Sequence, residues 1–258
     1  MNRLTEKNNY KTSDKAMSRT AALFPGLFFY LKMIGVVRKS ARLSKRGKYD
    51  YAAWVDSSLA IIRALESVGV RMSILHMDAF RQLHSPCVFI GNHMSVLETF
   101  VLPGIIQPDM DVTFIVKQSL VDYPVFKHIM RSRDPIVVTR SDPRGDLKRV
   151  LEGGEERLRG GVSIIVFPQT TRTHHFDPGQ FNSIGVKLAK RAGVPVVPFA
   201  VRSDAWGIGK KIKDFGRIDP SKPVFIEFDE PRPIRDNERE VHQYMIAFIQ
   251  DRLEKWFG

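Results

Sequence analysis

Residues 87–99 of this chain read Cys-Val-Phe-Ile-Gly-Asn-His-Met-Ser-Val-Leu-Glu-Thr. Four apolar residues make a strand-length run that stops at Gly91, where the backbone can turn sharply. Ser95 followed three residues later by Glu98 is the Ser-x-x-Glu signature of a helix start. The stretch therefore predicts a strand, a tight turn with polar side chains, and a helix.

Strand-like and helical patterns alternate along the rest of the chain. The strand-like runs are 70–75, 87–90, 112–116, 136–139, 162–167, 194–201 and 224–228. The helical patterns lie around 96–102, 125–131, 145–158, 184–192 and 239–257. This alternation predicts an α/β fold with a largely parallel or mixed central sheet covered by helices. In such folds, functional groups gather where strands end and loops begin.

The first 70 residues have a different pattern. About 18 polar residues, which we expect to be loose, precede a strongly apolar run at 21–37. This run contains a proline, a glycine and a lysine, and it is shorter than the ~20 apolar residues that a membrane span needs. We therefore favour a helix that lies on a membrane or docks on the protein. Apolar residues recur at helical spacing over 51–65, which predicts an N-terminal amphipathic helical hairpin within residues 1–70, before an α/β domain at 71–258.

The net charge of +12 favours polyanionic partners: nucleic acid, an anionic membrane, or phosphorylated and CoA-like substrates. A basic cluster directly follows the apolar run and consists of Arg38, Lys39, Arg42, Lys45, Arg46 and Lys48. It could be a solvated linker, but apolar aromatic residues next to lysine and arginine are also typical of a segment lying on an anionic leaflet. No nucleic-acid-binding motif accompanies the cluster, so we expect no nucleic-acid partner.

Cysteine and histidine usage limits the chemistry further. Cys87 is the only cysteine, so no intrachain disulfide can form, and a reducing cytosolic setting fits best. Its place in an apolar run favours core packing over reactivity. His174 and His175 lie together, but no other residue has a persuasive ligand spacing with them, and we expect no metal site.

His93 and Glu98 are the candidate catalytic pair. A histidine held by a carboxylate can take a proton and so activate a hydroxyl nucleophile. Five residues correspond to about 140° on an ideal helix. The side chains can therefore meet only if His93 precedes the helix and turns back over its first turn. Glu98 could instead cap the helix through the box that begins at Ser95, and both roles can coexist.

Basic residues lie at or just after the ends of other strand-like runs. The run 162–166 leads into Phe-Pro-Gln-Thr-Thr-Arg at 167–172. Arg172 suits a phosphate because its planar guanidinium can donate two hydrogen bonds at once, although the segment taken alone favours an exposed turn. Arg140 follows another apolar run, and Lys117 ends a third.

These segments, in this order, resemble the glycerophospholipid acyltransferase family, typified by 1-acyl-sn-glycerol-3-phosphate acyltransferases. The family's Asn-His-x-x-x-x-Asp block is matched by 92–98, and its arginine after an apolar strand by 136–140. Its Phe-Pro-Glu-Gly-Thr-Arg block is matched by 167–172, and its Val-Pro-Ile-Val-Pro strand by 194–198. The resemblance covers roughly residues 85–202, and the N-terminal hairpin is similar to the membrane-docking element of bacterial members.

Two departures from the family pattern bear on function. Glu98 replaces aspartate, which keeps the charge but adds a methylene. Gln169 and Thr170 replace Glu-Gly in the third block, which removes a carboxylate and a flexible glycine near the expected acceptor. We expect the chemistry to be retained, whereas the acceptor could differ from ordinary lysophosphatidic acid.

The resemblance implies a membrane-associated acyltransferase of phospholipid biosynthesis, peripheral on the cytoplasmic face of the cell membrane. His93 would be the base and Glu98 its orienting carboxylate. The implied substrate-binding residues are Asn92, Lys117, Arg140, Gln169, Thr170, Thr171 and Arg172. The donor would be acyl-CoA or acyl-carrier protein, the acceptor a hydroxyl of a lysophospholipid or glycerol-phosphate-type molecule, and no cofactor is implied.

Two other functions stay open on the sequence. The altered third block is compatible with a non-catalytic lipid- or membrane-binding relative. A thioesterase or lipid hydrolase could direct the same histidine at water, although no Gly-x-Ser-x-Gly nucleophile elbow is present.

Overall fold

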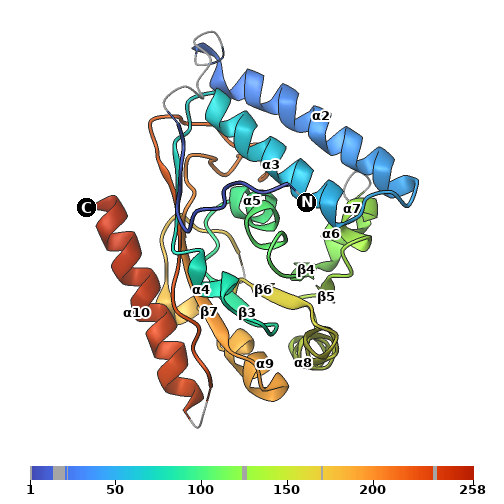
Figure 1. Ribbon diagram of the computed structural model, residues 1–258, viewed down its shortest axis with the longest axis vertical. Coiled ribbons are helices and arrows are strands. Elements are labelled where there is room, and N and C mark those ends of the chain that lie inside the picture. Colours follow the sequence, from blue (N-terminus) through green and yellow to red (C-terminus); the bar gives the residue numbers. More distant parts are fainter. Residues whose placement is uncertain (1, 14–20, 22, 124–126, 170, 235–236) are drawn as a thin grey trace.

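The computed structural model describes residues 2–13, 21, 23–123, 127–169, 171–234 and 237–258. Over these residues the chain forms one eight-stranded mixed sheet with helices on both faces (Figure 1). The strands are β1 (Tyr10–Lys11), β2 (Met72–Leu75), β3 (Val88–Gly91), β4 (Val112–Lys117), β5 (Ile136–Val138), β6 (Ser163–Val166), β7 (Val196–Arg202) and β8 (Val224–Phe228). The predicted α/β fold is confirmed.

The strand directions bring several strand ends to one edge of the sheet. The order is β1-β2-β8-β7-β3-β6-β4-β5. From β7 to β5 all neighbours are parallel, whereas β8 is antiparallel to β7 and β1 is antiparallel to β2. The carboxyl ends of β7, β3, β6, β4 and β5 therefore lie along the same edge, where an open α/β sheet places its functional loops.

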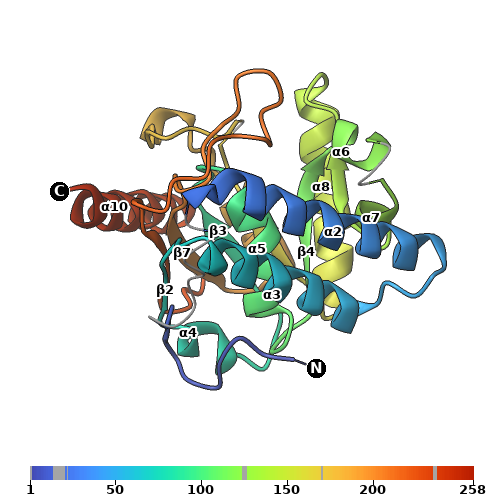
Figure 2. The same cartoon turned by 90° about the horizontal axis from the view of Figure 1, so that it is seen from above.

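Helices cover the two faces in separate layers (Figures 1 and 2). The helices are α2 (Pro25–Lys45), α3 (Tyr51–Ser67), α4 (Asp78–Arg81), α5 (Leu97–Ile106), α6 (Gln118–Asp122), α7 (Lys127–Arg131), α8 (Pro143–Arg159), α9 (Ile184–Ala192) and α10 (Glu238–Phe257). Helices α8, α9 and α10 pack on one face, and α3 and α5 on the other. Alternation along β3 serves both layers, because Phe89 points into the α3–α5 core while Val88 and Ile90 point into the other.

Strand β3 ends close against its neighbour β7. A Cβ atom at Gly91 would lie 2.4 Å from a ring carbon of Phe199 on β7. Only glycine fits there without displacing that ring. The close approach sets where the turn after β3 begins.

The N-terminal hairpin consists of α2 and α3. The side chain of Asp50 caps α3 by accepting a hydrogen bond of 2.8 Å from the Ala53 N–H. In α2 the buried residues Phe29, Met33 and Val37 recur at four-residue spacing, and they belong to the same hydrophobic cluster as the α3–α5 face of the sheet. Helix α2 continues to Lys45, so the basic cluster through that residue is helical and not a linker. The division of the chain at residue 70 stays a prediction.

The expected loose tail is wrong for residues 2–13. Tyr10 and Lys11 add an edge strand to the sheet, and the Tyr10 hydroxyl donates a hydrogen bond of 2.6 Å to Glu66. Arg3 forms an ion pair with Asp109. Polar composition alone missed these contacts, and the rest of that tail, 14–18, lies outside the described residues.

Two remaining expectations concern helices. The helix predicted from residue 125 is described only from Lys127, because 124–126 lie outside the described residues. Across the described chain, no helix combines the length and apolar character needed to traverse a bilayer.

Candidate active site

His93 lies in the turn between β3 and α5, and Glu98 lies in the first turn of α5. The imidazole Nδ1 of His93 is 2.9 Å from Oε1 of Glu98. The two side chains thus meet in the one way that their spacing allows, with His93 ahead of the helix and turned back over it. The Nδ1–carboxylate contact leaves Nε2 as the ring atom that can face a substrate.

Glu98 is fully buried and accepts several hydrogen bonds. Its Oε1 accepts from the Met94 N–H at 2.6 Å and the Ser95 N–H at 2.9 Å, and its Oε2 accepts from the Ser203 hydroxyl at 2.7 Å. Burial by itself would raise the pKa of Glu98, but the hydrogen bond and charge of His93, with the bonds from Ser203 and Ser95, outweigh it and lower the pKa. The carboxylate is therefore held ionised beside the imidazole.

The helix cap and the contact to histidine coexist. The N–H of Ser95 donates to Glu98, and the Ser95 hydroxyl accepts from the Leu97 N–H at 3.0 Å, so the box closes the helix start. The same Glu98 oxygen that accepts from Ser95 also contacts His93. Glutamate in place of the family's aspartate thus reaches the imidazole while it caps the helix.

The loop after β6 holds His93 at its backbone and at its ring. The N–H of His93 donates to Oε1 of Gln169 at 2.7 Å, and the His93 carbonyl accepts from the Thr173 N–H at 3.1 Å. The imidazole stacks on Phe167, with 4.4 Å between ring centroids and 19° between planes. These contacts fix the ring in place, and its side chain is 17% exposed.

Asn92 ties the end of β3 to β7. Its side chain is buried, and both of its polar atoms bond the backbone of Val201, the amide donating and the carbonyl accepting at 2.8 Å each. This pair of hydrogen bonds places Ser203, two residues after Val201, within hydrogen-bond distance of Glu98. In the structure the Asn92 side chain fixes the end of β3 against β7, and its role in substrate binding stays a prediction.

Arg172 also comes from the loop after β6. It pairs with Asp214, with 2.6 Å between Nη1 and Oδ1. Its neighbour Thr171 is exposed, and Thr170 lies outside the described residues. Gln169 is buried against His93, so its carbonyl oxygen serves the histidine backbone in this structure.

Arg140 and Lys117 follow neighbouring parallel strands. Lys117 ends β4 and is exposed. Arg140 follows β5 with φ of 64°, and the carboxylate of Asp146 accepts from the N–H groups of Thr139 at 2.8 Å and Arg140 at 2.6 Å. Partial burial lowers the pKa of Arg140, and the charge of Asp146 opposes this. Both cations thus lie at the edge of the sheet that carries His93.

Sequence reasoning missed three residues that shape this site. Ser203 bonds Glu98, Asp214 pairs with Arg172, and Asp146 holds the Arg140 loop. A signal existed for Ser203, because it directly follows a strand that ends at the same sheet edge as β3. Nothing in the spacing of Asp214 pointed to Arg172.

The model of the acyltransferase family matches residues 73–202. The chain belongs to the acyltransferase family. The matched region runs from β2 to the end of β7 and contains all the site residues inferred from the sequence. The family resemblance carried by the four sequence blocks is therefore confirmed.

Two curated family members show how far this similarity extends. A 1-acyl-sn-glycerol-3-phosphate acyltransferase of Pseudomonas aeruginosa is 29% identical over 71% of this chain and 66% of its own length. A chloroplastic 1-acyl-sn-glycerol-3-phosphate acyltransferase of Brassica napus is 32% identical over 49% of this chain and 34% of its own length. The alignments thus span about two thirds of one relative and one third of the other.

A solved structure shares the fold. The crystal structure of the 1-acyl-sn-glycerophosphate acyltransferase PlsC from Thermotoga maritima matches with a TM-score of 0.67 and covers 92% of this chain and 96% of its own. The sequences are 21% identical, so the comparison establishes a common architecture.

Proposed function

We propose that this protein is a membrane-associated acyltransferase of phospholipid biosynthesis. It would move a fatty acyl group from a thioester, either acyl-CoA or acyl-carrier protein, to a hydroxyl of a lysophospholipid or glycerol-phosphate-type acceptor. The observation that carries the proposal is the contact of His93 Nδ1 with the buried, ionised Glu98 in a chain of the acyltransferase family.

The geometry supports general base catalysis by His93. Nε2 takes the proton of the acceptor hydroxyl, and Glu98 stabilises the imidazolium through Nδ1. The acceptor oxygen attacks the thioester carbonyl, and the same nitrogen then returns its proton to the leaving thiolate. Acid–base catalysis of this kind contributes about 10²–10⁴-fold. We expect the reaction to need no metal, cofactor or covalent enzyme intermediate.

Three cations support the binding of phosphorylated substrates. Arg172, Arg140 and Lys117 follow parallel strands whose carboxyl ends share the edge of His93. An anionic headgroup or the phosphates of CoA would bind along this edge, where Arg172 belongs to the same loop that holds His93.

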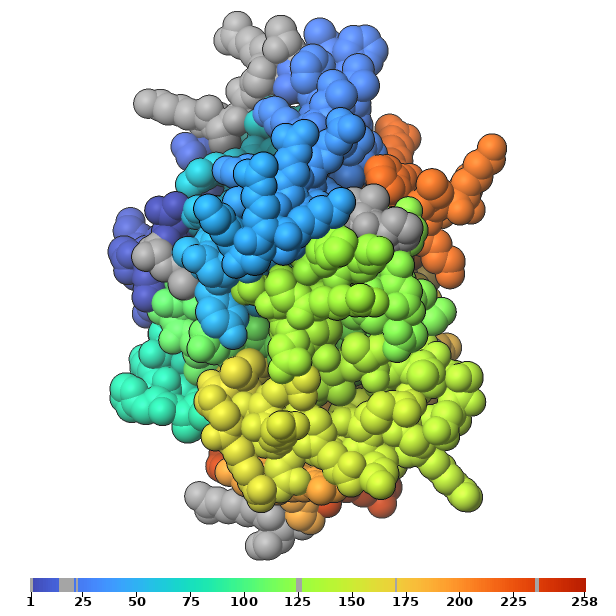
Figure 3. Space-filling view, turned by 90° about the vertical axis from the view of Figure 1, so that its right-hand side faces the viewer, coloured from blue at the N-terminus to red at the C-terminus, as the bar shows by residue number. Residues whose placement is uncertain are grey.

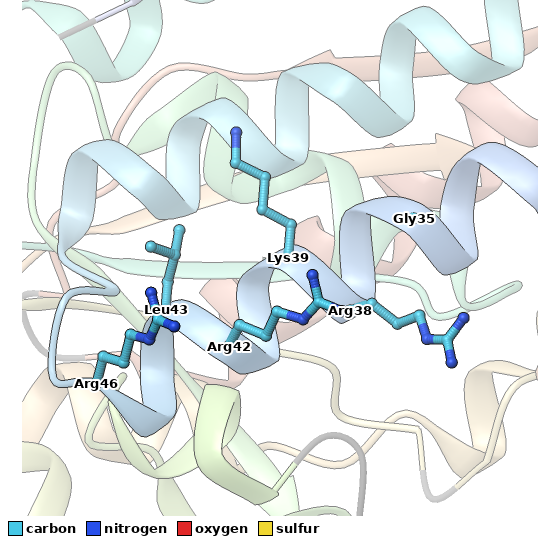
Figure 4. Close-up of a pocket in the computed structure, with 6 residues that line it drawn as sticks. All are labelled: Gly35, Arg38, Lys39, Arg42, Leu43 and Arg46. Carbon is cyan, nitrogen blue, oxygen red and sulfur yellow. The ribbon is translucent and has the colours of Figure 1, made fainter.

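The outer face of α2 supports docking on an anionic membrane. In Figure 3, α2 (blue) lies on the surface of the face turned to the viewer. Large apolar side chains are exposed just before α2 and in its first turns, namely Leu23, Phe24, Leu27, Leu31 and Ile34. Arg38, Lys39 and Arg42 of its later turns and Arg46, directly after its end, line a surface hollow of about 360 Å³ (Figure 4). An apolar end for the acyl region and a cationic end for headgroups suit a helix lying in the membrane plane.

Peripheral attachment at the cytoplasmic face of the cell membrane is the location we propose. The anionic leaflet there matches the cations of α2, and a single buried thiol suits a reducing compartment.

The test of the function compares His93→Ala with a matched control, His84→Ala, at an exposed histidine outside the site. Each protein is incubated with acyl-CoA or acyl-carrier protein and a mixed lysolipid extract, and products are identified by mass spectrometry. We expect the wild type and His84→Ala to form an acylated lipid, and His93→Ala to lose at least 100-fold of the rate with an unchanged melting temperature.

Other outcomes point to other functions. Undiminished transfer by His93→Ala would remove the histidine from the mechanism. Release of free fatty acid without an acylated product would indicate a thioesterase. Binding to anionic vesicles without consumption of any thioester would indicate a non-catalytic lipid-binding relative.

A further inference from the structure

The segment 207–217 between β7 and β8, here called the 207–217 loop, presents large apolar side chains to solvent. Ile212 is 55% exposed and Phe215 is 45% exposed. Three exposed lysines surround them, namely Lys210, Lys211 and Lys213. Among the residues that the structure describes, these lysines have no ion-pair partner. Exposed apolar side chains that gather at one place mark an interaction surface.

The loop is ordered, so its apolar residues are held away from the core. Trp206 and Ile218 form an antiparallel bridge at its base. At its tip, the Gly209 N–H donates to the Lys213 carbonyl at 3.1 Å. The two arms also approach closely, because a Cβ atom at Gly216 would collide with the carbonyl of Gly207 on the other arm. The backbone therefore fixes the tip in a projecting position.

The loop lies beside the apolar part of α2. Phe215 stacks on Tyr30 of α2, with 5.2 Å between ring centroids, and the Tyr30 hydroxyl donates to the Gly216 carbonyl. Three and four residues from Tyr30 along the helix lie Leu27, which is 59% exposed, and Ile34, which is 41% exposed, so both are its neighbours on the helix surface. Figures 2 and 3 show the orange chain of this region projecting beside blue α2. The two elements thus form one continuous apolar surface.

We propose that the 207–217 loop is a second membrane contact, in which Ile212 and Phe215 enter an anionic leaflet. The three lysines of the tip bind the lipid headgroups. This rests on the part of the proposed function in which α2 docks on the same leaflet. Large apolar side chains next to lysines are the composition of segments that lie at a membrane surface. A helix alone can roll about its axis, whereas two contacts side by side hold the protein in one orientation.

The charge of the tip complements an anionic leaflet. Asp214 is the one acidic residue of the 207–217 loop, and it pairs with Arg172, with 2.6 Å between Nη1 and Oδ1. The lysines therefore keep an uncompensated positive charge. An acidic protein could also bind these lysines, but it would have to cover apolar residues on the loop and on α2 together. A leaflet covers both at once, with its acyl region next to its anionic headgroups.

The experiment places a fluorophore that reports polarity on the tip of the loop. Cys87 is buried, and burial raises the pKa of its thiol to about 12, so a thiol reagent will react with an introduced cysteine instead. The variants are Ile212→Cys and the matched control Lys148→Cys, at an exposed position of α8 across the sheet from α2. Each labelled protein is mixed with phosphatidylglycerol vesicles, with phosphatidylcholine vesicles, and with soluble acyl-carrier protein.

We expect the emission at position 212 to shift to the blue with phosphatidylglycerol vesicles and to be quenched by lipids that carry a nitroxide on the acyl chain. The emission at position 148 should not change. Unlabelled Ile212→Asn should bind these vesicles roughly tenfold more weakly at every salt concentration, which is the size that burial of one aliphatic side chain supports.

The lysines should contribute in a way that depends on salt. Lys211→Gln should weaken binding to phosphatidylglycerol vesicles roughly fivefold at low ionic strength, and the loss should fade as salt is added. The matched control, Lys148→Gln, should lose less. Melting temperatures of all variants should equal that of the wild type, because both residues of the tip are exposed.

The opposing results are distinct. Vesicle binding that leaves the emission at position 212 unchanged would refute the second contact and keep the docking of α2. An equal response to phosphatidylcholine vesicles would refute the role of the lysines. A response to acyl-carrier protein in place of vesicles would make the tip a protein-binding surface and refute membrane insertion. If the wild type binds no vesicles, this proposal fails together with membrane docking, whereas acyl transfer that depends on His93 would still support the catalytic part of the proposed function.

Discussion

The charged groups around Glu98 and those on the outer face of α2 differ in whether they have partners within the described part of the protein. Glu98 is fully buried and bonded by the backbone, by Ser203 and by His93. Along the outer face of α2, Arg38 and Arg42 form no ion pair and no side-chain hydrogen bond with any residue that the structure describes. A fully bonded carboxylate can hold one imidazole in one orientation. Unpaired cations on a helix suit a partner of variable geometry, such as a lipid surface.

The largest expected effect is at Glu98. Glu98→Ala leaves buried donors of Met94, Ser95 and Ser203 without an acceptor, and we expect it to lower the free energy of unfolding by about 3–5 kcal/mol. Glu98→Gln keeps the shape but not the charge that stabilises an imidazolium. We expect it to fold and to lose about 10²–10⁴-fold in acyl transfer. Chemical denaturation and initial rates measure the two effects.

The pH dependence of stability separates Glu98 from an ordinary buried carboxylate. Because folding lowers the pKa of Glu98, its contribution is present above the unfolded pKa of about 4.3 and is lost as pH falls through the folded value. In Glu98→Gln, the free energy of unfolding should therefore fall less steeply as the pH is lowered. The matched control is Glu66→Gln, at a buried glutamate bonded by Tyr10, which should leave the rate of acyl transfer unchanged. A full rate in Glu98→Gln would contradict the orienting role.

Gln169 gives the next effect. Gln169→Leu leaves the partly buried N–H of His93 without its acceptor, which should cost about 1 kcal/mol of stability and let the imidazole shift. Gln169→Glu restores the residue of the family block and keeps an oxygen acceptor, so we expect it to fold. Melting temperature and rate together measure the result. If Gln169→Leu matches the wild type in both, the His93 backbone does not depend on this bond.

The strand ends account for how much the sequence could predict. The apolar run before Gly91 and the Ser95–Glu98 box gave both β3 and the start of α5, because strand period and cap chemistry are local. The same local rules placed His93 before the helix. Parallel pairing then brought the other strand-end cations to the same edge.

The partners of these groups could not be predicted, because they depend on tertiary packing. Ser203 reaches Glu98 only because β7 lies beside β3 and Asn92 fixes their relative position. Asp214 reaches Arg172 through a loop whose path is set by rings of α2 and α5. In both cases polar residues far apart in sequence meet through contacts that have no local signal.

A smaller effect is expected on the outer face of α2. Arg42→Gln should weaken binding to vesicles containing phosphatidylglycerol by about 1 kcal/mol, or roughly fivefold, at low ionic strength, and the loss should fade as salt is added. The matched control is Lys148→Gln, which removes an exposed cation on α8, across the sheet from α2. Sedimentation with vesicles measures the binding. Equal losses in the two variants would show that only net charge matters, and the contrast with Glu98 would lose its structural basis.

The smallest effect is expected at Asp146. Its carboxylate is bonded by backbone N–H groups, as Glu98 is, but its charged partner is exposed, as the cations of α2 are. Its carboxylate accepts from the N–H groups of Thr139 and Arg140 and pairs with the exposed Arg149. Burial opposes ionisation, but the bonds from Arg149 and from those N–H groups outweigh it and lower the pKa from 3.8 to about 2. The stabilisation is therefore present above pH ~4 and disappears between pH ~4 and ~2. Asp146→Asn should lower stability slightly at neutral pH and converge with the wild type near pH 2, as denaturation from pH 2 to 7 can measure. A difference that stays constant across that range would mean that shape, and not charge, holds the Arg140 loop.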